Sequence, residues 1–294
     1  MSFPRLAIAA LLIAAACRGR EAHSATGFTD DFGAEVRAGT RDAPARIVSL
    51  NPATTEILFA LGAGARVVGR THWDTAPDSA RAVPDLGPGI RPNVEAVLAA
   101  RPDLVILYAS DDDRPAARQL AAAGIPVLAL KTDRIDQFQR AVRLVGLATG
   151  ANAAAGVVVD TVLASLARVR AATHALPRPR VFWHVWDSPI YTIGRGSYLD
   201  ELLATAGGAN VFGDLDAPSP QVSLEEIVRR DPDLILAGPE GAARIRASAA
   251  WQGVRAVREG RVLVVDTMLV GRPSVRMGEA AASLARLLHP GVHP

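Results

Sequence analysis

Two series of short hydrophobic runs dominate the pattern of polar and apolar positions along this chain. The runs are rich in Val, Ile and Leu, and they alternate with Ala- and Leu-rich stretches whose apolar positions follow helical spacing. This alternation is typical of parallel α/β sheets, whose buried strands are apolar on both faces. The predicted strands are 46–50, 66–69, 103–107 and 125–130 in the first series, and 180–184, 210–212, 233–237 and 261–265 in the second.

The stretch between the two series lacks strand signals. Within 133–175, Val157, Leu163, Leu166 and Val169 recur at spacings of six, three and three residues, which predicts one or two long helices. The predicted fold class is therefore α/β, with two Rossmann-like lobes joined by a long backbone helix. The expected boundaries are an N-terminal lobe at 46–132, linking helices at 133–177 and a C-terminal lobe at 178–294.

The two series also repeat each other in sequence. GARVVG at 64–69 matches GANVFG at 208–213, and the Glu-initiated segment ending in PDLVI at 95–106 matches the one ending in PDLIL at 225–236. Two matched segments in the same order indicate two copies of one structural unit. A chain of two similar lobes has a cleft between them, and such junctions commonly bind small ligands.

The N-terminus has the features of an export signal. Arg5 precedes an apolar run at 6–16, which is too short to span a bilayer, and small residues then precede Cys17, the sole cysteine. We expect 1–16 to be a removed signal peptide and 17–45 to form a spacer and a small hairpin. We expect no later stretch to approach the length of a membrane span.

Composition and charge exclude several other classes. The chain is 49% hydrophobic and 21% charged, which is ordinary for a globular protein. Its 32 basic and 30 acidic residues are interspersed without a basic run, so nucleic-acid binding is not expected. A P-loop, an HExxH helix, a cysteine cluster and a GxSxG elbow are all missing from the sequence, so we predict no enzyme, no catalytic residue and no metal site.

Three segments resemble periplasmic binding proteins for cobalamin, ferric siderophores and haem. RIVSLNPATTE at 46–56 is similar to the opening of that family, 29–33 to the hairpin that precedes it, and PQVSLE at 220–225 to its second-lobe signature. The resemblance extends over nearly the whole mature chain. It implies a rigid helical backbone between the lobes, limited closure on the ligand, and docking onto an ABC permease.

The resemblance also implies where the protein resides. AAAC at 14–17 is similar to the lipobox of bacterial lipoproteins, although Ala14 stands where leucine is usual. It implies that Cys17 carries a lipid anchor, and that the exported protein is held at a membrane of the periplasm or cell envelope.

The family's docking glutamates, one per lobe, fall on Glu95 and Glu225. Each lies two residues after a good helix cap, Asn93 or Ser223, so both are expected in the first turn of equivalent helices. Glu226 lies three residues after Ser223 and can close a capping box, which would leave Glu225 facing outward.

Candidate ligand-binding residues lie in the loops that follow the strands, because open α/β sheets bind ligands at the carboxyl ends of their strands. Aromatic faces could stack on a macrocycle, His or Tyr could ligate iron, and Arg70 or Arg272 could pair with an anionic group. In 181–186, alternation places Trp183 on one face and His184 with Trp186 on the other. The predicted set is His72, Trp73, Tyr108, His184, Trp186, Tyr191 and Arg272.

The predicted function is a substrate-binding lipoprotein that delivers a ligand to an ABC importer. The ligand class is a cobalamin, a ferric siderophore or haem, carried as cargo and not as a cofactor. The resemblance weakens cobalamin, because Gly89 and Ser219 occupy the places where that branch has its flanking tryptophans. One alternative is a divalent-metal receptor, with three or four His and carboxylate ligands. The other is a hydrolase that uses Glu95 and Glu225 as carboxylates about 5 to 9.5 Å apart.

Overall fold

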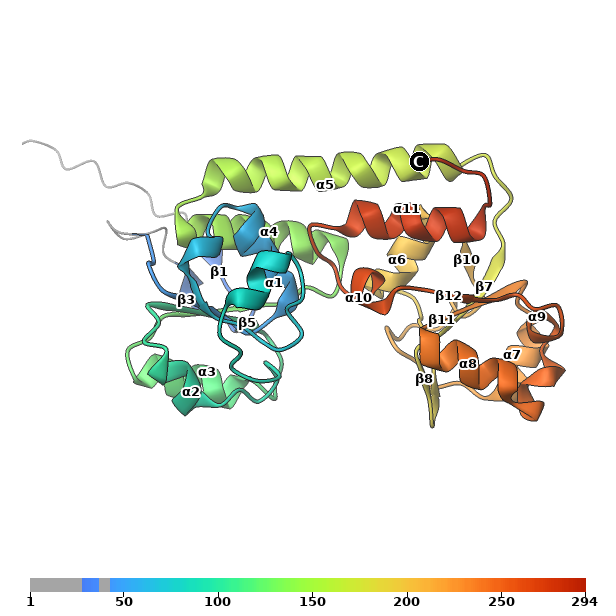
Figure 1. Cartoon of the computed structure of the whole chain (residues 1–294), viewed down its shortest axis with the longest axis horizontal. Helices are drawn as coiled ribbons and strands as arrows, with labels where there is room; N and C mark the ends of the chain where they lie inside the picture. Colours follow the sequence, from blue (N-terminus) through green and yellow to red (C-terminus); the bar gives the residue numbers. More distant parts are fainter. Residues whose placement is uncertain (1–27, 37–42) are drawn as a thin grey trace, which may run out of the picture.

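The computed structural model describes residues 28–36 and 43–294. The expected signal peptide and Cys17 lie outside the described residues. Two lobes, each built on a four-stranded parallel sheet, are connected along one side by helices (Figure 1). This confirms the predicted fold class.

The two sheets have the same strand order. In the N-terminal lobe it is β4 (Val67–Gly69), β3 (Ile47–Ser49), β5 (Leu104–Tyr108) and β6 (Val127–Leu130). In the C-terminal lobe it is β10 (Ala209–Asn210), β7 (Arg180–His184), β11 (Leu234–Ala237) and β12 (Val262–Val264). Each predicted strand is present, and the ends differ by a residue or two, as helix and strand ends commonly do.

The repeat extends to side-chain hydrogen bonds. The carboxylate of Asp103, just before β5, accepts from the backbone N–H of Arg46 at 2.9 Å. The carboxylate of Asp233, just before β11, accepts from the backbone N–H of Arg180 at 2.8 Å. Equivalent aspartates, Asp103 and Asp233, therefore fix the start of the neighbouring central strand, which is β3 in the first lobe and β7 in the second.

Helices cover the faces of the two sheets. The N-terminal lobe has α1 (Pro52–Ala60), α2 (Val94–Ala99) and α3 (Arg114–Ala122), with the 3-10 turns η1 (Gly64–Arg66) and η2 (Asp78–Ala82). The C-terminal lobe has α6 (Tyr198–Thr205), α7 (Leu224–Arg230), α8 (Pro239–Ala247), η3 (Ala249–Gly253), α9 (Arg255–Arg258) and α10 (Thr267–Val270).

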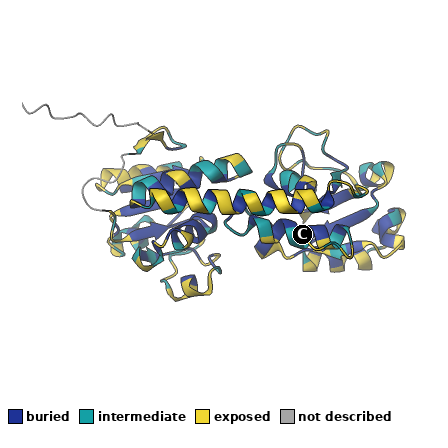
Figure 2. Ribbon diagram, turned by 90° about the horizontal axis from the view of Figure 1, so that it is seen from above, coloured by how far each residue is buried: buried dark blue, intermediate teal, exposed yellow. Residues whose placement is uncertain are grey.

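Three helices form the connection between the lobes. α4 (Ile135–Thr149) and α5 (Asn152–Thr173) follow the first sheet, and α11 (Met277–Leu288) returns to pack along α5. One face of α5 is buried against them and the other is exposed along its whole length (Figure 2). One core cluster includes Ile57 of the first lobe, Val159 of α5 and Leu202 of the second lobe. The lobes are therefore joined by packed side chains.

Contrary to expectation, one later segment has the length and composition of a membrane span. α5 has 22 residues and a mean hydropathy of 1.3 over its most apolar 18-residue window. Its apolar residues at three- and four-residue spacing, Val159, Val162, Leu166 and Val169, are buried within the protein. These residues form the buried stripe of an amphipathic helix, although only 28% of the apolar window is buried and Val157 is 66% exposed.

The small N-terminal hairpin covers an edge of the first sheet. β1 (Phe28–Thr29) pairs with β2 (Glu35–Val36), and the turn between them carries Asp30 and Asp31. The Asp30 carboxylate accepts from the N–H of Ala129 at 3.0 Å, and the Asp31 carboxylate accepts from Lys131 at 2.7 Å. Backbone groups of the edge strand β6 are thereby satisfied.

Candidate functional site

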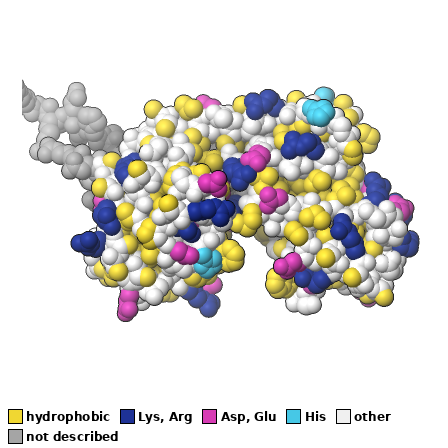
Figure 3. All heavy atoms as spheres, viewed as in Figure 1, with side chains coloured by type: hydrophobic (Ala, Val, Ile, Leu, Met, Phe, Trp, Pro, Cys, Tyr) yellow, Lys and Arg dark blue, Asp and Glu magenta, His cyan; other side chains and the backbone are white. Residues whose placement is uncertain are grey.

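The carboxyl ends of the two sheets meet at a cleft between the lobes. Its central cavity has a volume of about 660 Å³ and is lined from both sides, by Asn51, Tyr108 and Asp133 of the first lobe and by Ser197 and Arg272 of the second. Figure 3 shows the surface hollowed between the lobes on the side away from α5, with hydrophobic side chains on both walls. The cavity therefore lies between the two lobes, where the sequence predicts a ligand cleft.

A second hollow of about 600 Å³ adjoins the cavity on the side of the C-terminal lobe. Val185, Leu199 and Gly271 line both. Trp186 and Pro239 contribute to its wall. Together the two hollows can accommodate a ligand larger than a typical metabolite, because small-molecule sites commonly measure 300 to 1,000 Å³.

Each lobe exposes one tryptophan shortly after one of its parallel strands. Trp73 follows β4 and is 53% exposed, and Trp186 follows β7 and is 62% exposed. Tryptophan is usually largely buried. Two exposed indoles, one from each lobe, are therefore the clearest apolar binding surfaces among the predicted residues.

His72 and Tyr191 accompany these tryptophans. The exposed imidazole of His72 packs edge-on against Trp73, with ring centroids 4.5 Å apart. Tyr191 is half-buried and lies opposite Trp186 in the hairpin of β8 (Trp186–Asp187) and β9 (Ile190–Tyr191). The predicted residues thus form one aromatic pair in each lobe.

Tyr108 lines the central cavity but its hydroxyl is already engaged. It donates a hydrogen bond to Asp133 Oδ1 at 2.6 Å. Burial and the neighbouring Asp133 carboxylate raise the pKa of the Tyr108 hydroxyl. The phenol is therefore neutral at physiological pH, whereas an iron ligand would have to be the phenolate.

His184 lies below the surface of the second hollow and is 4% exposed. Its Nε2 is 2.7 Å from Asp187 Oδ1, and burial lowers the pKa of the imidazole. His184 and Trp186 both line the second hollow. The strand alternation that was expected to group them stops short of Trp186, because β7 ends at His184 and Trp186 begins the β8–β9 hairpin.

Arg272 bridges the lobes at the floor of the cleft. Its Nη1 donates to the carbonyl oxygen of Trp73 at 3.4 Å, and its Nε lies 3.6 Å from Glu56 Oε1. Arg70 was expected to be available for an anionic group of the ligand, but its side chain binds the protein backbone. Its guanidinium donates to the carbonyl oxygens of Thr71 and Ala80 and so stabilises its own loop.

Two buried carboxylates beside Arg272 escaped the sequence analysis. Glu56 on α1 is 4% exposed and Asp74 after Trp73 is 1% exposed, and burial raises the pKa of both. Glu56 Oε2 has no hydrogen-bond partner among the described residues. Glu56 is the last residue of the 46–56 segment that resembles the opening of the family. Helical spacing alone does not indicate that its side chain would lie beside Arg272 of the other lobe.

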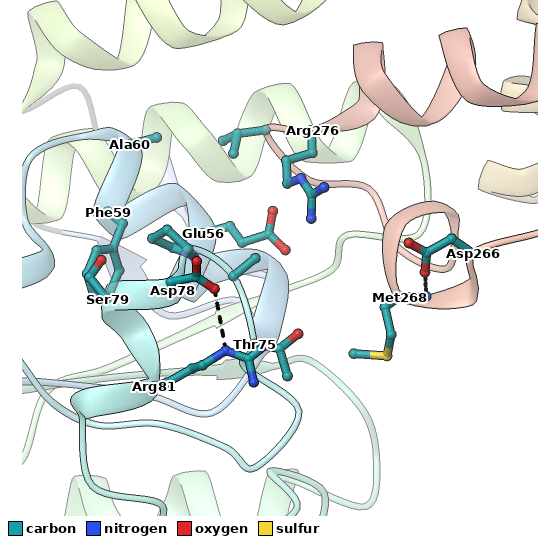
Figure 4. A pocket seen from close by; sticks show the side chains of 13 residues that line it. Glu56, Phe59, Ala60, Thr75, Asp78, Ser79, Arg81, Asp266, Met268 and Arg276 are labelled. Carbon is teal, nitrogen blue, oxygen red and sulfur yellow. Dashed lines mark hydrogen bonds and ion pairs between the residues drawn. The ribbon is translucent and has the colours of Figure 1, made fainter.

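Glu56 opens onto a lateral hollow of about 920 Å³ between α1, η2 and α10. Figure 4 shows its carboxylate pointing toward the guanidinium of Arg276 across this space. Arg276 itself pairs with Glu279 at 2.8 Å. The lateral hollow is thus a junction of charged groups from the two lobes. Of the two exposed tryptophans, Trp186 lines the second hollow of the cleft, whereas the Trp73 indole lines none of these cavities.

Glu95 and Glu225 both lie exposed in first turns, on α2 and α7. Asn93 caps α2 by accepting from Ala96 N at 3.1 Å, and Ser223 caps α7 by accepting from Glu226 N at 3.2 Å. Hydrogen bonds from its own backbone N–H and the Ser223 hydroxyl lower the pKa of Glu225. Figure 1 shows α2 and α7 on the side of the molecule away from α5.

The expected capping box at α7 is only half formed. The Glu226 carboxylate does not return to Ser223 but pairs with Arg229 and, at 2.7 Å, with Arg230. Two arginines on the next turn are stronger partners for a carboxylate than one backbone N–H. Glu225 is exposed next to this cluster.

Within residues 28–36 and 43–294, no three His, Cys, Asp or Glu side chains are grouped so that they could hold a metal ion. The structure therefore offers no support for the divalent-metal alternative, which requires three or four converging ligands.

Comparisons with known proteins agree with this geometry. The family model described as periplasmic binding protein matches residues 47–268. The uncharacterized ABC transporter substrate-binding lipoprotein YvrC of Bacillus subtilis is 32% identical over 255 residues, which cover 84% of this chain and 81% of the relative. The cobalamin-binding protein of Halobacterium salinarum is 32% identical over 263 residues, covering 84% of this chain and 70% of the relative.

A solved structure shares the whole architecture. The periplasmic heme-binding protein RhuT from Roseiflexus sp. RS-1, in its apo form, superposes with a TM-score of 0.75 at 27% sequence identity. The match covers 83% of this chain and 97% of that protein. The two-lobed fold is thus one that known ligand-binding proteins use.

Proposed function

The chain belongs to the periplasmic binding protein family, and we propose that it captures a corrinoid in the cleft between its lobes. It is an ABC transporter substrate-binding protein of the cobalamin, haem and siderophore type. The observation that carries the corrinoid proposal is the pair of exposed tryptophans, Trp73 and Trp186, one on each lobe. Trp186 lines the second hollow, and the Trp73 carbonyl accepts a hydrogen bond from Arg272, which lines the central cavity.

A large macrocycle with a conjugated ring system suits these two side chains. Indole rings stack on flat π-systems and bury a large area with little loss of side-chain entropy. A corrinoid also brings its own cobalt coordination, so it needs no metal ligand from the protein. This agrees with Tyr108 and His184, whose polar atoms already bind Asp133 and Asp187. The Halobacterium relative named for cobalamin supports the same class. Gly89 and Ser219, which stand where the cobalamin branch has its tryptophans, count against it, so the proposal rests on Trp73 and Trp186 at other positions.

Haem is the second candidate, and one residue favours it. His72 is exposed beside Trp73, and its ring could ligate an iron whose macrocycle stacks on the indole. The haem-binding protein of Roseiflexus has the same fold. Haem would then be carried by the first lobe's His72 and Trp73 together.

Delivery to the permease is proposed to use Glu95 and Glu225. Equivalent helices of the two lobes present one exposed carboxylate each. A two-fold permease could bind them with one arginine on each half, which would orient the complex and speed association. Neither glutamate lines the cleft cavities, which separates delivery from capture.

The protein acts at the cell envelope after export, as its family and its lipoprotein relative indicate. We further propose that a lipid on Cys17 anchors it there, which is supported by the AAAC segment at 14–17. Its role in this proposal is binding without catalysis, so no residue is assigned a catalytic task.

Native mass spectrometry with an ultraviolet-visible spectrum tests the ligand class, using protein purified from its own cells. A bound corrinoid would give the corresponding mass increment and corrin absorption bands. A haem spectrum that disappears in His72→Ala would favour the second candidate. A ferric-chelate spectrum, or bare metal, would contradict both.

A further inference from the structure

Each exposed tryptophan is followed directly by an aspartate whose carboxylate is held within its own lobe. The pairs are Trp73-Asp74 and Trp186-Asp187. We propose that Asp74 and Asp187 are positioning residues, which fix the two tryptophan-bearing loops before a ligand arrives. The inference rests on the proposed function insofar as the tryptophans bind the ligand.

In the N-terminal lobe, Asp74 is the centre of a buried hydrogen-bond network. Its Oδ2 accepts from the Thr55 hydroxyl at 2.6 Å, which ties the loop to α1. Its Oδ1 accepts from the Thr71 hydroxyl at 2.6 Å, and Thr71 Oγ1 in turn accepts from the backbone N–H of Trp73 at 3.2 Å. The carboxylate is therefore linked to the backbone of Trp73 through one hydroxyl group.

The carbonyl of Trp73 is occupied as well. It accepts from the N–H of Thr75 at 3.0 Å and from Nη1 of Arg272, in the opposite lobe, at 3.4 Å. Both polar backbone groups of Trp73 are thus fixed while its indole remains 53% exposed. A fixed backbone under an exposed ring is what a preformed stacking surface requires.

Asp187 does the same for the second lobe through different partners. One carboxylate oxygen is 2.7 Å from Nε2 of His184 at the end of β7, and the other accepts from Nε of Arg244 on α8. The adjoining Trp186 lies opposite Tyr191 in the hairpin, and Val185 N donates to the Tyr191 carbonyl at 3.0 Å. The carboxylate therefore anchors the hairpin to the sheet and to α8.

Aspartate suits this task because an ionised carboxylate accepts from several donors at once. Asparagine would keep the size but would turn an NH2 group toward one of those donors. Alanine would remove the link altogether. A loop that is ordered before binding loses less entropy on binding, so loosening it should weaken affinity even if the tryptophan itself is unchanged.

The direct test is ¹⁹F NMR of protein labelled with 5-fluorotryptophan, whose resonances are assigned with Trp→Phe variants. We expect Asp74→Asn and Asp74→Ala to broaden the Trp73 resonance and leave Trp186 sharp. We expect Asp187→Asn and Asp187→Ala to do the reverse. Broadening of all resonances together would indicate general unfolding and would contradict a positioning role.

Two controls change acidic residues away from these networks. Asp78→Asn alters a fully exposed carboxylate paired with Arg81, and Glu259→Gln alters an exposed partner of Arg255 in the other lobe. Both should leave the Trp73 and Trp186 resonances as they are in the wild type.

Affinity for cyanocobalamin gives the second measurement. Each aspartate variant should bind roughly 3- to 10-fold more weakly than the wild type, and the controls should bind equally well. Sharp tryptophan resonances together with unchanged affinity in both variants of either aspartate would overturn the inference for that lobe. If the wild type itself fails to bind cyanocobalamin, the corrinoid proposal fails, and the NMR result alone decides whether the aspartates fix the loops.

Discussion

At the scale of single residues, Glu56 combines an acidic side chain with almost complete burial. Desolvation raises its pKa above the ordinary value of about 4.5, more strongly than the Ser274 hydroxyl and the nearby Arg272 and Arg276 lower it. The folded protein therefore holds the Glu56 proton more tightly than the unfolded chain does. Stability from this group is fully present below pH 4.5 and is lost as the pH rises through the folded-state pKa.

Glu56→Gln should abolish this loss of stability at higher pH, because glutamine carries no titrating group. The free energy of unfolding of the variant, relative to the wild type, should increase as the pH rises above about 4.5 and level off above the folded-state pKa. Urea denaturation across pH 4 to 8 measures this difference. Glu259→Gln, at an exposed position, should show a difference that does not change in this way. A Glu56→Gln difference that stays constant or falls with pH would contradict the assigned cause.

Sequence reasoning placed single residues with uneven success. It named Trp73 and Trp186 because they follow predicted strands, and both are exposed, but only Trp186 lines a cavity of the cleft. It did not indicate that the polar atoms of His184 and Tyr108 would be engaged, because their partners Asp187 and Asp133 are chosen by the folded loops. Asp74 was missed for the same reason, since its main partner Thr55 comes from a different element.

At the scale of elements, α4 and α5 meet at an unusually close contact. A Cβ atom added at Gly146 of α4 would lie 2.6 Å from the Cβ of Ala155 on α5, well inside contact distance. The glycine thus allows the linking helices to pack closely. Gly156 lies on the exposed face of α5, where a Cβ atom would have nothing within 4 Å.

These two glycines make a matched pair of variants. Gly146→Ala should destabilise the protein by about 1 to 3 kcal/mol, because overpacking forces the helices apart. Gly156→Ala should stabilise it by roughly 0.5 to 1 kcal/mol, because alanine favours the helix and meets no neighbour. Chemical denaturation of both variants measures the difference. Equal effects of the two substitutions would contradict the close helix contact.

Most elements could be predicted from local pattern. The strands have long apolar runs bounded by turn residues, and the repeat gave the equivalence of the two sheets. The role of α11 could not be predicted, because its apolar spacing indicates a helix but not that it packs along α5. The half-formed capping box could not be predicted either. The Glu226 carboxylate could bind either the cap or the arginines of the next turn, and in the structure it pairs with Arg229 and Arg230.

At the scale of the whole molecule, α2 and α7 lie on the side away from α5 (Figure 1). Their first turns carry the exposed Glu95 and Glu225. Exposed ion pairs contribute only about 0.2 to 1 kcal/mol each. Glu95→Ala or Glu225→Ala alone should therefore reduce transport modestly, and the double variant should reduce it severely. Raised salt should mimic both by screening.

Transport into vesicles that contain the permease measures this effect, with ligand affinity measured in parallel. Asp160→Ala, at an exposed position on α5, is the control and should transport normally. Affinity should stay at the wild-type level in every variant. Loss of ligand binding in the double variant, with normal transport at saturating ligand, would place these glutamates in ligand capture instead.

The central claim is that the cleft captures a corrinoid between Trp73 and Trp186. Isothermal titration calorimetry with cyanocobalamin tests it most directly, using the wild type, each Trp→Ala variant and the double variant. We expect one ligand per wild-type molecule. Each single substitution should weaken binding by about 2 kcal/mol, roughly 30-fold, because buried aromatic anchors dominate binding energy. Absence of binding to the wild type, or equal affinity in the double variant, would contradict the claim.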